Sequence, residues 1–398
     1  MPQTHPTAER RTPRPWWFRL GGWALALVMV VVLTMLVVDN GTYGATEHTV
    51  ADTPASPLTG EPAPTLTQQA SDGVDSYLAG PVVATISEHG AVAKDVSTGE
   101  ELWHYARSDT TVCAHRTNAQ HVTLIYASGD RCDEAVSFDP ATGQRQWQRT
   151  IEAVHPNQII WADSSFISLD PAKTILFEDG QGFERFTLDN SKTDHIEGEH
   201  TTCENMDAAG SPRVATLQRC RATADEQWVY QIVVNEASDG DPREAGRSYL
   251  TGLVNPAIEG VAPDGTTILR DANGILYTLP LGATDPLPIS GIPAVSDGQA
   301  VNVLAMRGTI VISTESTAYA LDRSSTGVMW VTDVIAAPYG LGNKFYVPTE
   351  IGIDERDAIT GQLIRTIGWD APIVAPAEII VSGPLVGLRD AVGLRVYS

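Results

Sequence analysis

The sequence predicts an all-β fold built from repeated units, and two observations lead to this prediction. Short runs of Val, Ile, Leu, Thr and Tyr alternate with clusters of Gly, Asp, Asn and Pro, which is typical of short strands joined by tight turns. The phrase "DVSTGEELW" at residues 95–103 also returns as "DPATGQRQW" at residues 139–147. Because such repetition is typical of repeat architectures, each unit is expected to be a small group of strands that stacks on its neighbours.

The first element is an apolar run at residues 20–38, "LGGWALALVMVVVLTMLVV", which predicts a transmembrane helix. At about 1.5 Å per residue this run nearly spans a hydrocarbon core of about 30 Å. Four arginines precede it and no Lys or Arg follows until Lys94, so the positive-inside rule places residues 1–19 in the cytoplasm as a short basic segment. The alternative is a signal peptide cleaved near Ala45, although the run is longer than the usual apolar region of such peptides.

Residues 39–73 form the next segment, which is rich in Thr, Pro, Ala and Ser and has little apolar periodicity. This composition predicts a disordered tether that holds the following domain off the membrane. The rest of the chain, residues 74–398, is then one extracytoplasmic domain. We therefore expect a single-pass protein of the cell membrane with a cytoplasmic N-terminus.

The charge of the chain excludes one class of partner. There are 26 Lys and Arg against 49 Asp and Glu, a formal net charge of -23. Such a chain is not expected to bind nucleic acid, or an anionic membrane surface through charge. The lipid bilayer is expected as a partner only through residues 20–38. The acidic domain could select basic proteins, or its charge could simply keep it soluble.

Four cysteines lie in the predicted exterior domain, where an even number in an oxidising compartment indicates disulfides. Three pairings are possible. The short separations favour Cys113 with Cys132 and Cys203 with Cys220. A metal site is disfavoured because the chain has no C-x-x-C and no nearby pair of histidines.

The repeated phrase falls where one strand ends and the next begins. In each copy the Asp can cap a hairpin turn, the Gly supplies a positive φ, and the Trp lies in the following strand. Two looser copies occur at "ALDRSSTGVMW" and "ERDAITGQLIR", and Arg365 replaces the Trp in the second. The motif residues of the four copies are Asp95, Gly99, Trp103, Asp139, Gly143, Trp147, Asp322, Gly327, Trp330, Asp357 and Gly361.

The spacing of these copies predicts the number of units. Weaker hairpins fill the long gap between the second and third copies, and residues 74–398 hold eight units of about forty residues, the length of a four-stranded propeller blade. The predicted fold is therefore a β-propeller of eight blades, with seven as the alternative. Ring closure is expected from residues 74–80, which could complete the blade made by residues 385–398.

The pattern A-x-D-x-x-T-G-x-x-x-W, met by Ala93, Asp95, Thr98, Gly99 and Trp103, resembles the tryptophan-docking repeat of PQQ-like (quinoprotein-type) β-propellers. This resemblance implies that the Trp docks against the adjacent blade and that the Gly allows its close approach. The motif is specific for the fold and gives almost no information about activity. Trp103, Trp147 and Trp330 are accordingly expected to pack between blades, rather than to form an aromatic cage for a ligand.

The same resemblance raises the possibility of a quinone-dependent dehydrogenase, which the residues disfavour. Catalytic members of that family are longer and carry two adjacent cysteines and a calcium site. Here no two cysteines are adjacent, and Asp239 and Asp241 are more typical of a solvated loop. We therefore predict no enzymatic activity, no catalytic residue, no cofactor and no metal.

Two other candidate sites are also weak. The segment "DHIEGEH", residues 194–200, lacks the helical spacing of zinc-binding histidines and is interpreted as an acidic loop. No G-x-S-x-G is present to indicate a serine nucleophile. The histidines of the strands and turns are interpreted as structural, and they are His89, His104, His115, His121 and His155.

Function must then depend on surface and location. Non-enzymatic relatives of this type act as scaffolds in cell-envelope protein assembly, so the resemblance implies a membrane-anchored propeller that binds bacterial envelope or membrane proteins. The alternative is a propeller that binds a small ligand, or acts as an enzyme, through its central funnel. That alternative requires polar side chains from several blades to converge on the axis.

Overall fold

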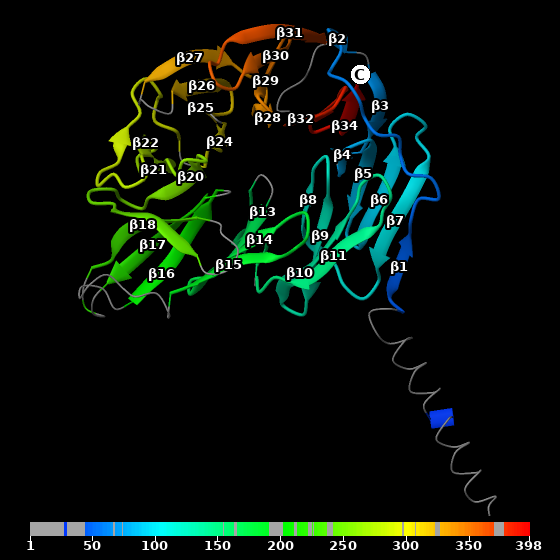
Figure 1. Cartoon of the computed structure of the whole chain (residues 1–398), viewed down its shortest axis with the longest axis horizontal. Coiled ribbons are helices and arrows are strands. Elements are labelled where there is room, and N and C mark those ends of the chain that lie inside the picture. The colour runs from blue at the N-terminus through cyan, green and yellow to red at the C-terminus, as the bar shows by residue number, and fades with distance from the viewer. Residues whose placement is uncertain are drawn as a thin grey trace, which may run out of the picture.

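The computed structural model shows an eight-bladed β-propeller (Figure 1). The residues that the structure describes are 28–29, 44–66, 68–73, 75–153, 155–162, 165–190, 202–210, 213–221, 225, 227–236, 242–296, 298–306, 308–322, 327–369 and 378–398. Over these residues the strands form eight antiparallel sheets of four or more strands, with one added parallel pairing. The prediction of an all-β fold with eight blades is confirmed over the alternative of seven.

The first four blades follow one another along the chain. Blade I holds β4 (Ser76–Ala79), β5 (Val82–Ser87), β6 (Gly90–Asp95) and β7 (Glu101–Arg107). Blade II holds β8 (Val112–Thr117), β9 (Val122–Ser128), β10 (Arg131–Phe138) and β11 (Arg145–Thr150). After a 3-10 turn, η1 (Pro156–Gln158), blade III holds β12 (Ile159–Trp161), β13 (Ser165–Leu169), β14 (Lys173–Glu178) and β15 (Glu184–Asp189). Blade IV holds β16 (Thr202–Ala209), β17 (Arg213–Arg221), β18 (Val229–Glu236) and β19 (Arg243–Tyr249).

The other four blades complete the ring. Blade V holds β20 (Ala257–Val261), β21 (Thr267–Arg270), β22 (Leu276–Leu279) and β23 (Leu287–Pro288). Blade VI holds β24 (Asn302–Ala305), β25 (Thr309–Ser313), β26 (Thr317–Asp322) and β27 (Val328–Asp333). Blade VII holds β28 (Tyr339–Leu341), β29 (Lys344–Thr349), β30 (Gly352–Asp357) and β31 (Leu363–Trp369). Blade VIII holds β32 (Glu378–Ser382), β33 (Leu385–Arg389) and β34 (Leu394–Tyr397).

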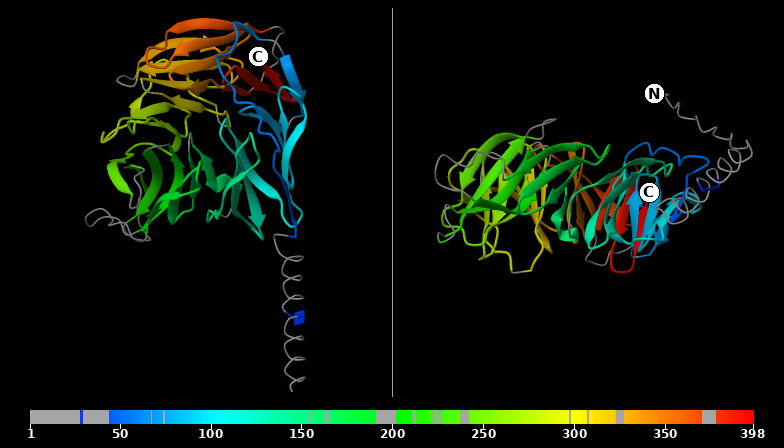
Figure 2. Two further views of the ribbon diagram at one scale, coloured as in Figure 1. Left: turned by 45° about the vertical axis from the view of Figure 1, so that its right-hand side comes forward. Right: turned by 90° about the horizontal axis from the view of Figure 1, so that it is seen from below.

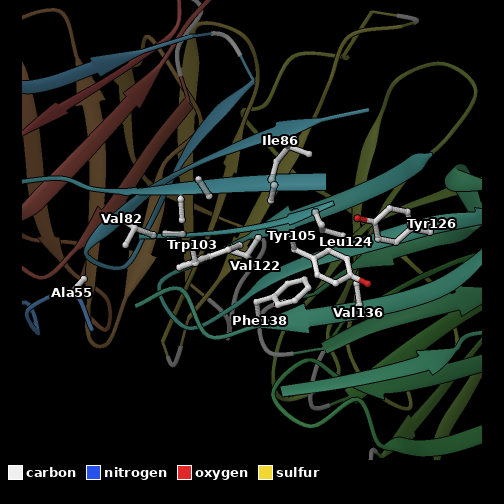
Figure 3. Packing of buried hydrophobic residues seen from close by; sticks show 14 residues of the cluster. Ala55, Val82, Ile86, Trp103, Tyr105, Val122, Leu124, Tyr126, Val136 and Phe138 are labelled. Carbon is white, nitrogen blue, oxygen red and sulfur yellow. The ribbon is translucent and has the colours of Figure 1, made fainter. Parts of the chain in front are cut away.

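The core lies between neighbouring blades, because both faces of each sheet are apolar. Val82 and Ala84 of blade I, for example, are buried in one cluster with Val122, Leu124 and Phe138 of blade II (Figure 3). Sheets covered on both faces favour continuous apolar strands, and every residue of β13 and of β25 is buried. The blades therefore stack face to face round the ring, which is flatter than it is wide (Figure 2).

Alternating connections divide the ring into two faces. The turns between the first and second strands, and between the third and fourth strands, form what we call the motif face, because it holds the repeated turns at residues 95–99 and 139–143. The remaining connections form the opposite face. In each blade the first strand lies nearest the centre and the fourth lies at the rim (Figure 1).

The segment predicted as a disordered tether, residues 39–73, differs from that expectation wherever it is described. It forms β1 (Thr46–Thr49), β2 (Thr65–Leu66) and β3 (Gln68–Asp72), which pair with the outer strands of blades I, VII and VIII. Each strand is too short to show periodicity and obtains its hydrogen bonds from the edge of a formed sheet. Residues 44–66 and 68–72 therefore form a strap on the propeller.

Ring closure uses a different segment from the one expected. The fourth strand of blade VIII is β3, with Gln68 opposite Tyr397 and Asp72 opposite Leu394. Residues 76–79, which were expected to close this blade, form the inner strand of blade I instead. The chain thus passes from the rim of blade VIII to the centre of blade I, as it does between the other blades.

The predicted transmembrane helix lies outside the described residues except for Val28 and Met29, which are helical. In the part of the chain that the structure describes, no helix is long and apolar enough to cross a membrane. The predicted cytoplasmic segment, residues 1–19, also lies outside the described part.

Both favoured disulfides are confirmed. Cys113 of β8 is bonded to Cys132 of β10 across the intervening strand β9, with Cα atoms 6.0 Å apart. Cys203 of β16 is bonded to Cys220 of β17, its direct cross-strand neighbour, with Cα atoms 4.1 Å apart. Each bond therefore joins strands within a single blade.

Candidate functional site

The repeated motif builds a capped turn followed by a docked tryptophan. In the first copy, Asp95 Oδ1 accepts the backbone N–H groups of Ser97 at 2.8 Å and Thr98 at 3.1 Å. The N–H of Gly99 donates to the Asp95 carbonyl at 2.8 Å. These bonds satisfy the turn backbone, so the strand that follows leaves at a defined angle.

Trp103 crosses from blade I to the turn of blade II. Its side chain is fully buried, and its indole N–H donates to the Pro140 carbonyl at 2.7 Å. A Cβ atom on Gly143 would lie 2.3 Å from Trp103 Cγ, and the φ of Gly143 is +70°. Position 143 therefore requires Gly both for its backbone conformation and for the approach of the indole.

The same contact recurs at two other seams. Trp147 of blade II donates to the Asp179 carbonyl at 2.6 Å and packs against Gly182 of blade III. Trp330 of blade VI packs against Gly361 of blade VII. Each of these tryptophans lies between two blades, which is the packing expected for a structural role rather than for a ligand cage.

Blade VII departs from the pattern. Arg365 pairs across the strands with Glu355, as Trp103 does with Ala93. The Glu355 side chain is fully buried, 2.7 Å from Lys344 Nζ and 2.9 Å from Arg365 Nη2. Glu61 of the strap reaches Lys344 at 2.7 Å. An ion-pair network thus stands where other blades have a docked tryptophan, and hydrogen bonds from Lys344 to Glu355 and then Glu61 raise the pKa of Lys344.

The strap also makes specific contacts with blade I. His104 Nδ1 lies 2.8 Å from Glu101 Oε1, and its Nε2 lies 3.4 Å from Glu47 of β1. These carboxylates, Glu101 foremost, raise the pKa of His104. His48 Nε2 donates to the carbonyl of Gly143 at 2.8 Å. The strap is therefore tied directly to a turn that carries the repeated motif.

A second cluster gathers on the first strands of blades I, II and VIII and the second strand of blade VIII, near the centre, where a ligand-binding funnel requires polar groups. Tyr77 of β4 meets the ring of His115 of β8 edge-on, with centroids 5.0 Å apart. The Arg389 guanidinium lies 4.4 Å from the centroid of Tyr77 and donates to Glu378 at 2.9 Å. Three blades, VIII, I and II, thus contribute to one polar cluster, called here the inner cluster.

Burial sets the protonation of the inner cluster. Desolvation, assisted by the nearby Arg389 charge, lowers the pKa of His115. Desolvation also raises the pKa of Tyr77. Both groups are therefore neutral near pH 7, whereas Arg389 and Glu378 form an ion pair whose side chains are 31% and 50% exposed. The cluster presents neutral hydrogen-bonding groups beside a charge pair that solvent can reach.

The remaining candidate sites are a metal site, the predicted acidic loops and a surface groove. Among the described residues, no group of three or more His, Cys, Asp or Glu side chains is placed to hold a metal ion. The predicted acidic loop at residues 194–200, and Asp239 with Asp241, lie outside the described part of the chain. A shallow, open groove of about 490 Å³ runs beside blade II and is lined by Ser128, Asp133, Glu134, Gln148, Arg149 and Thr150.

Sequence reasoning missed the inner cluster and identified one turn that receives a tryptophan only as a weaker hairpin. The cluster joins residues from the start and end of the domain, so only a known blade register could reveal it. That turn is "EDGQGF", residues 178–183, which receives Trp147 through Gly182. Its D-G-x-G spacing was a usable signal, but it lacks the Thr of the repeated phrase.

With the fold and the docked tryptophans established, the class of the protein is clear: it is an eight-bladed β-propeller, and its tryptophan-docking repeat is similar to that of PQQ-like propellers. A family model described as "Outer membrane protein assembly factor BamB" matches residues 25–184, which is less than half of the chain. No curated protein matches the sequence.

Several solved structures are similar to the chain. The computationally designed Ika8 protein is 15% identical, covering 84% of this chain and 98% of its own, with a TM-score of 0.46. BamB from Moraxella catarrhalis is 11% identical, covering 84% and 99%, with a TM-score of 0.45. The C-terminal WD40 domain of Sif2 is 12% identical, covering 84% and 97%, with a TM-score of 0.46.

Proposed function

We propose that the protein is a membrane-anchored, extracytoplasmic β-propeller that binds other proteins as a scaffold in the bacterial cell envelope. Residues 20–38 anchor it in the cell membrane with residues 1–19 in the cytoplasm, and the propeller lies outside. The matched family description names an outer membrane protein assembly factor, which supports a role in binding proteins. No catalytic role is proposed.

The observation that carries this proposal is the distribution of exposed apolar side chains on the opposite face. Val254, Ile275, Ile351 and Val392 lie in connections of blades IV–V, V, VII and VIII, and Ile351 and Val392 are 78% and 85% exposed. The strap crosses the motif face, where Ala55 donates to the Ala141 carbonyl at 3.1 Å. The opposite face thus offers separated apolar contact points between polar loops.

Co-purification of the full chain from its own membranes in a mild detergent tests this proposal. We expect a protein partner at constant stoichiometry, and we expect the variant Ile351→Ser with Val392→Ser to lose it. The matched control is Leu287→Ser, which removes a 48% exposed leucine from the rim strand β23. Equal retention of the partner by both variants would show that the opposite face does not bind it.

The inner cluster supports a second candidate function, the binding of a small polar ligand in the centre of the ring. A ligand at 100 times its Kd stabilises the folded state by about 2.7 kcal/mol, so thermal unfolding with small carboxylates and amines can find one. A true ligand would raise the midpoint of the wild type and of the exposed-site control His155→Ala, but not of His115→Ala. If no compound shifts the unfolding midpoint of the control differently from that of His115→Ala, ligand binding in the central funnel has no support.

A further inference from the structure

The strap changes how far the propeller can lie from the membrane. Backbone pairing begins at Ala45, whose carbonyl accepts the Ser108 N–H at 2.9 Å, and continues through β1 along β7. Ala45 is only seven residues beyond Val38, the end of the apolar run. A fully extended chain advances at most about 3.6 Å per residue, so Ala45 lies within about 25 Å of that end.

This reach is short compared with the propeller itself. A compact domain of this length has a radius of gyration of about 20 Å and is therefore on the order of 50 Å across. The chain that joins the apolar run to Ala45 cannot bring the far side of the ring to the bilayer in place of blade I. The attachment point thus decides which side of the propeller lies near the membrane.

The position of β1 shows where the chain enters the propeller. Strand β1 lies along the outer edge of blade I, and its first residues lie at the rim of the disc rather than over either face (Figure 1). Thr46 pairs with Arg107, and Ser108 donates to Ala45, at the end of the rim strand β7 that leads into the opposite face. The chain therefore reaches the propeller at the outer edge of blade I, on the side of the opposite face.

We propose that the lipid bilayer is the partner of the rim of blade I, and that the propeller stands edge-on with this rim at the membrane surface. This inference rests on the proposed anchor at residues 20–38. The net charge of -23 gives the rim no general attraction to anionic headgroups, so the length of the chain holds it there. Both faces of the disc then remain open to proteins, and blade V, opposite blade I, is remote from the bilayer.

Energy transfer to acceptor dyes on lipid headgroups tests this arrangement. The full chain is reconstituted into vesicles with a fluorescent amino acid at Glu88 or, in a second preparation, at Ala272. Both residues are exposed and occupy the turn between the second and third strands, Glu88 in blade I and Ala272 in blade V. We expect strong transfer from Glu88, weak transfer from Ala272, and no change of either between low and high salt.

The contrary outcomes are distinct. Strong transfer from both positions would show a face-on propeller, and equal weak transfer from both would show one held away from the bilayer, so each overturns the inference. A loss of the Glu88 signal at high salt would also overturn it, because charge would then hold the rim. Flotation of the vesicles is measured in parallel, since a protein that does not float with lipid disproves the anchor rather than the orientation.

Discussion

Substitution of Gly143 by Ala measures how much the tryptophan contact contributes. A Cβ atom at position 143 would lie 2.3 Å from Trp103 Cγ, and the residue has a φ of +70°. The left-handed conformation costs Ala roughly 1–2 kcal/mol, of which about 0.4–1 kcal/mol is recovered through the less flexible unfolded chain. Forcing an atom into a packed seam adds about 1–3 kcal/mol. We therefore expect Gly143→Ala to destabilise the protein by about 1.5–4 kcal/mol.

Gly99 provides a matched control within the same motif. Its φ is +72°, but no atom lies within 4 Å of a Cβ built at this position. Gly99→Ala should therefore show the backbone cost alone, about 0.5–1 kcal/mol. Chemical unfolding of the purified full chain, followed by fluorescence, gives both values provided that the slope with denaturant is unchanged.

A double-mutant cycle then isolates the contact. In a Trp103→Ala background the indole is gone, so the cost of Gly143→Ala should fall to that of Gly99→Ala. If Gly143→Ala costs no more than Gly99→Ala in the wild type, or if its cost is unchanged when Trp103 is removed, the docking account is refuted.

Three further predictions concern other contacts. Replacing Cys203 and Cys220 together by Ser should cost about 3 kcal/mol, the value for a loop of this length, and an unchanged unfolding midpoint would contradict it. Because the pKa of His104 is raised in the folded protein, its contribution to the free energy of unfolding is fully present below the unfolded-state pKa near 6.5. That contribution is lost as the pH rises through the folded-state pKa. Hydrogen exchange of β1 should therefore be slower at pH 5.5 than at pH 8 after correction for intrinsic rates, and His104→Gln should remove that difference. Arg365→Met leaves the buried Glu355 with one partner fewer and should cost about 3 kcal/mol, whereas a neutral result would show that the network does not support blade VII.

The parts of the fold that were predictable from the sequence depend on local chemistry. The D-x-x-T-G turn can be recognised from the sequence because its Asp caps the turn and its Gly adopts a positive φ, both within five residues. The pairing of Cys113 with Cys132 follows in the same way from a short separation. The four copies, the weaker hairpins between them and a unit length of about forty residues together gave eight blades, with seven as the alternative.

The strap was not predictable because its strands carry almost no signal of their own. Strand β2 has two residues, and Leu66, fully buried against blades VII and VIII, is the main sign that it packs. The partner of β2 is β31, about 300 positions away in the sequence. The inner cluster has the same origin, since Tyr77 and Arg389 meet only when the ring closes.

The central claim, that the propeller binds proteins at the membrane, is tested most directly by crosslinking within the native membrane. A photoreactive amino acid at Ile351 or Val392 reports on the opposite face, and one at Leu287 on the rim of blade V serves as the control. The account predicts a discrete protein adduct from both face positions, identified by mass spectrometry, and none at the same mass from the control. Face positions that capture no more protein than the control would contradict the scaffold function and leave the inner cluster as the site to pursue.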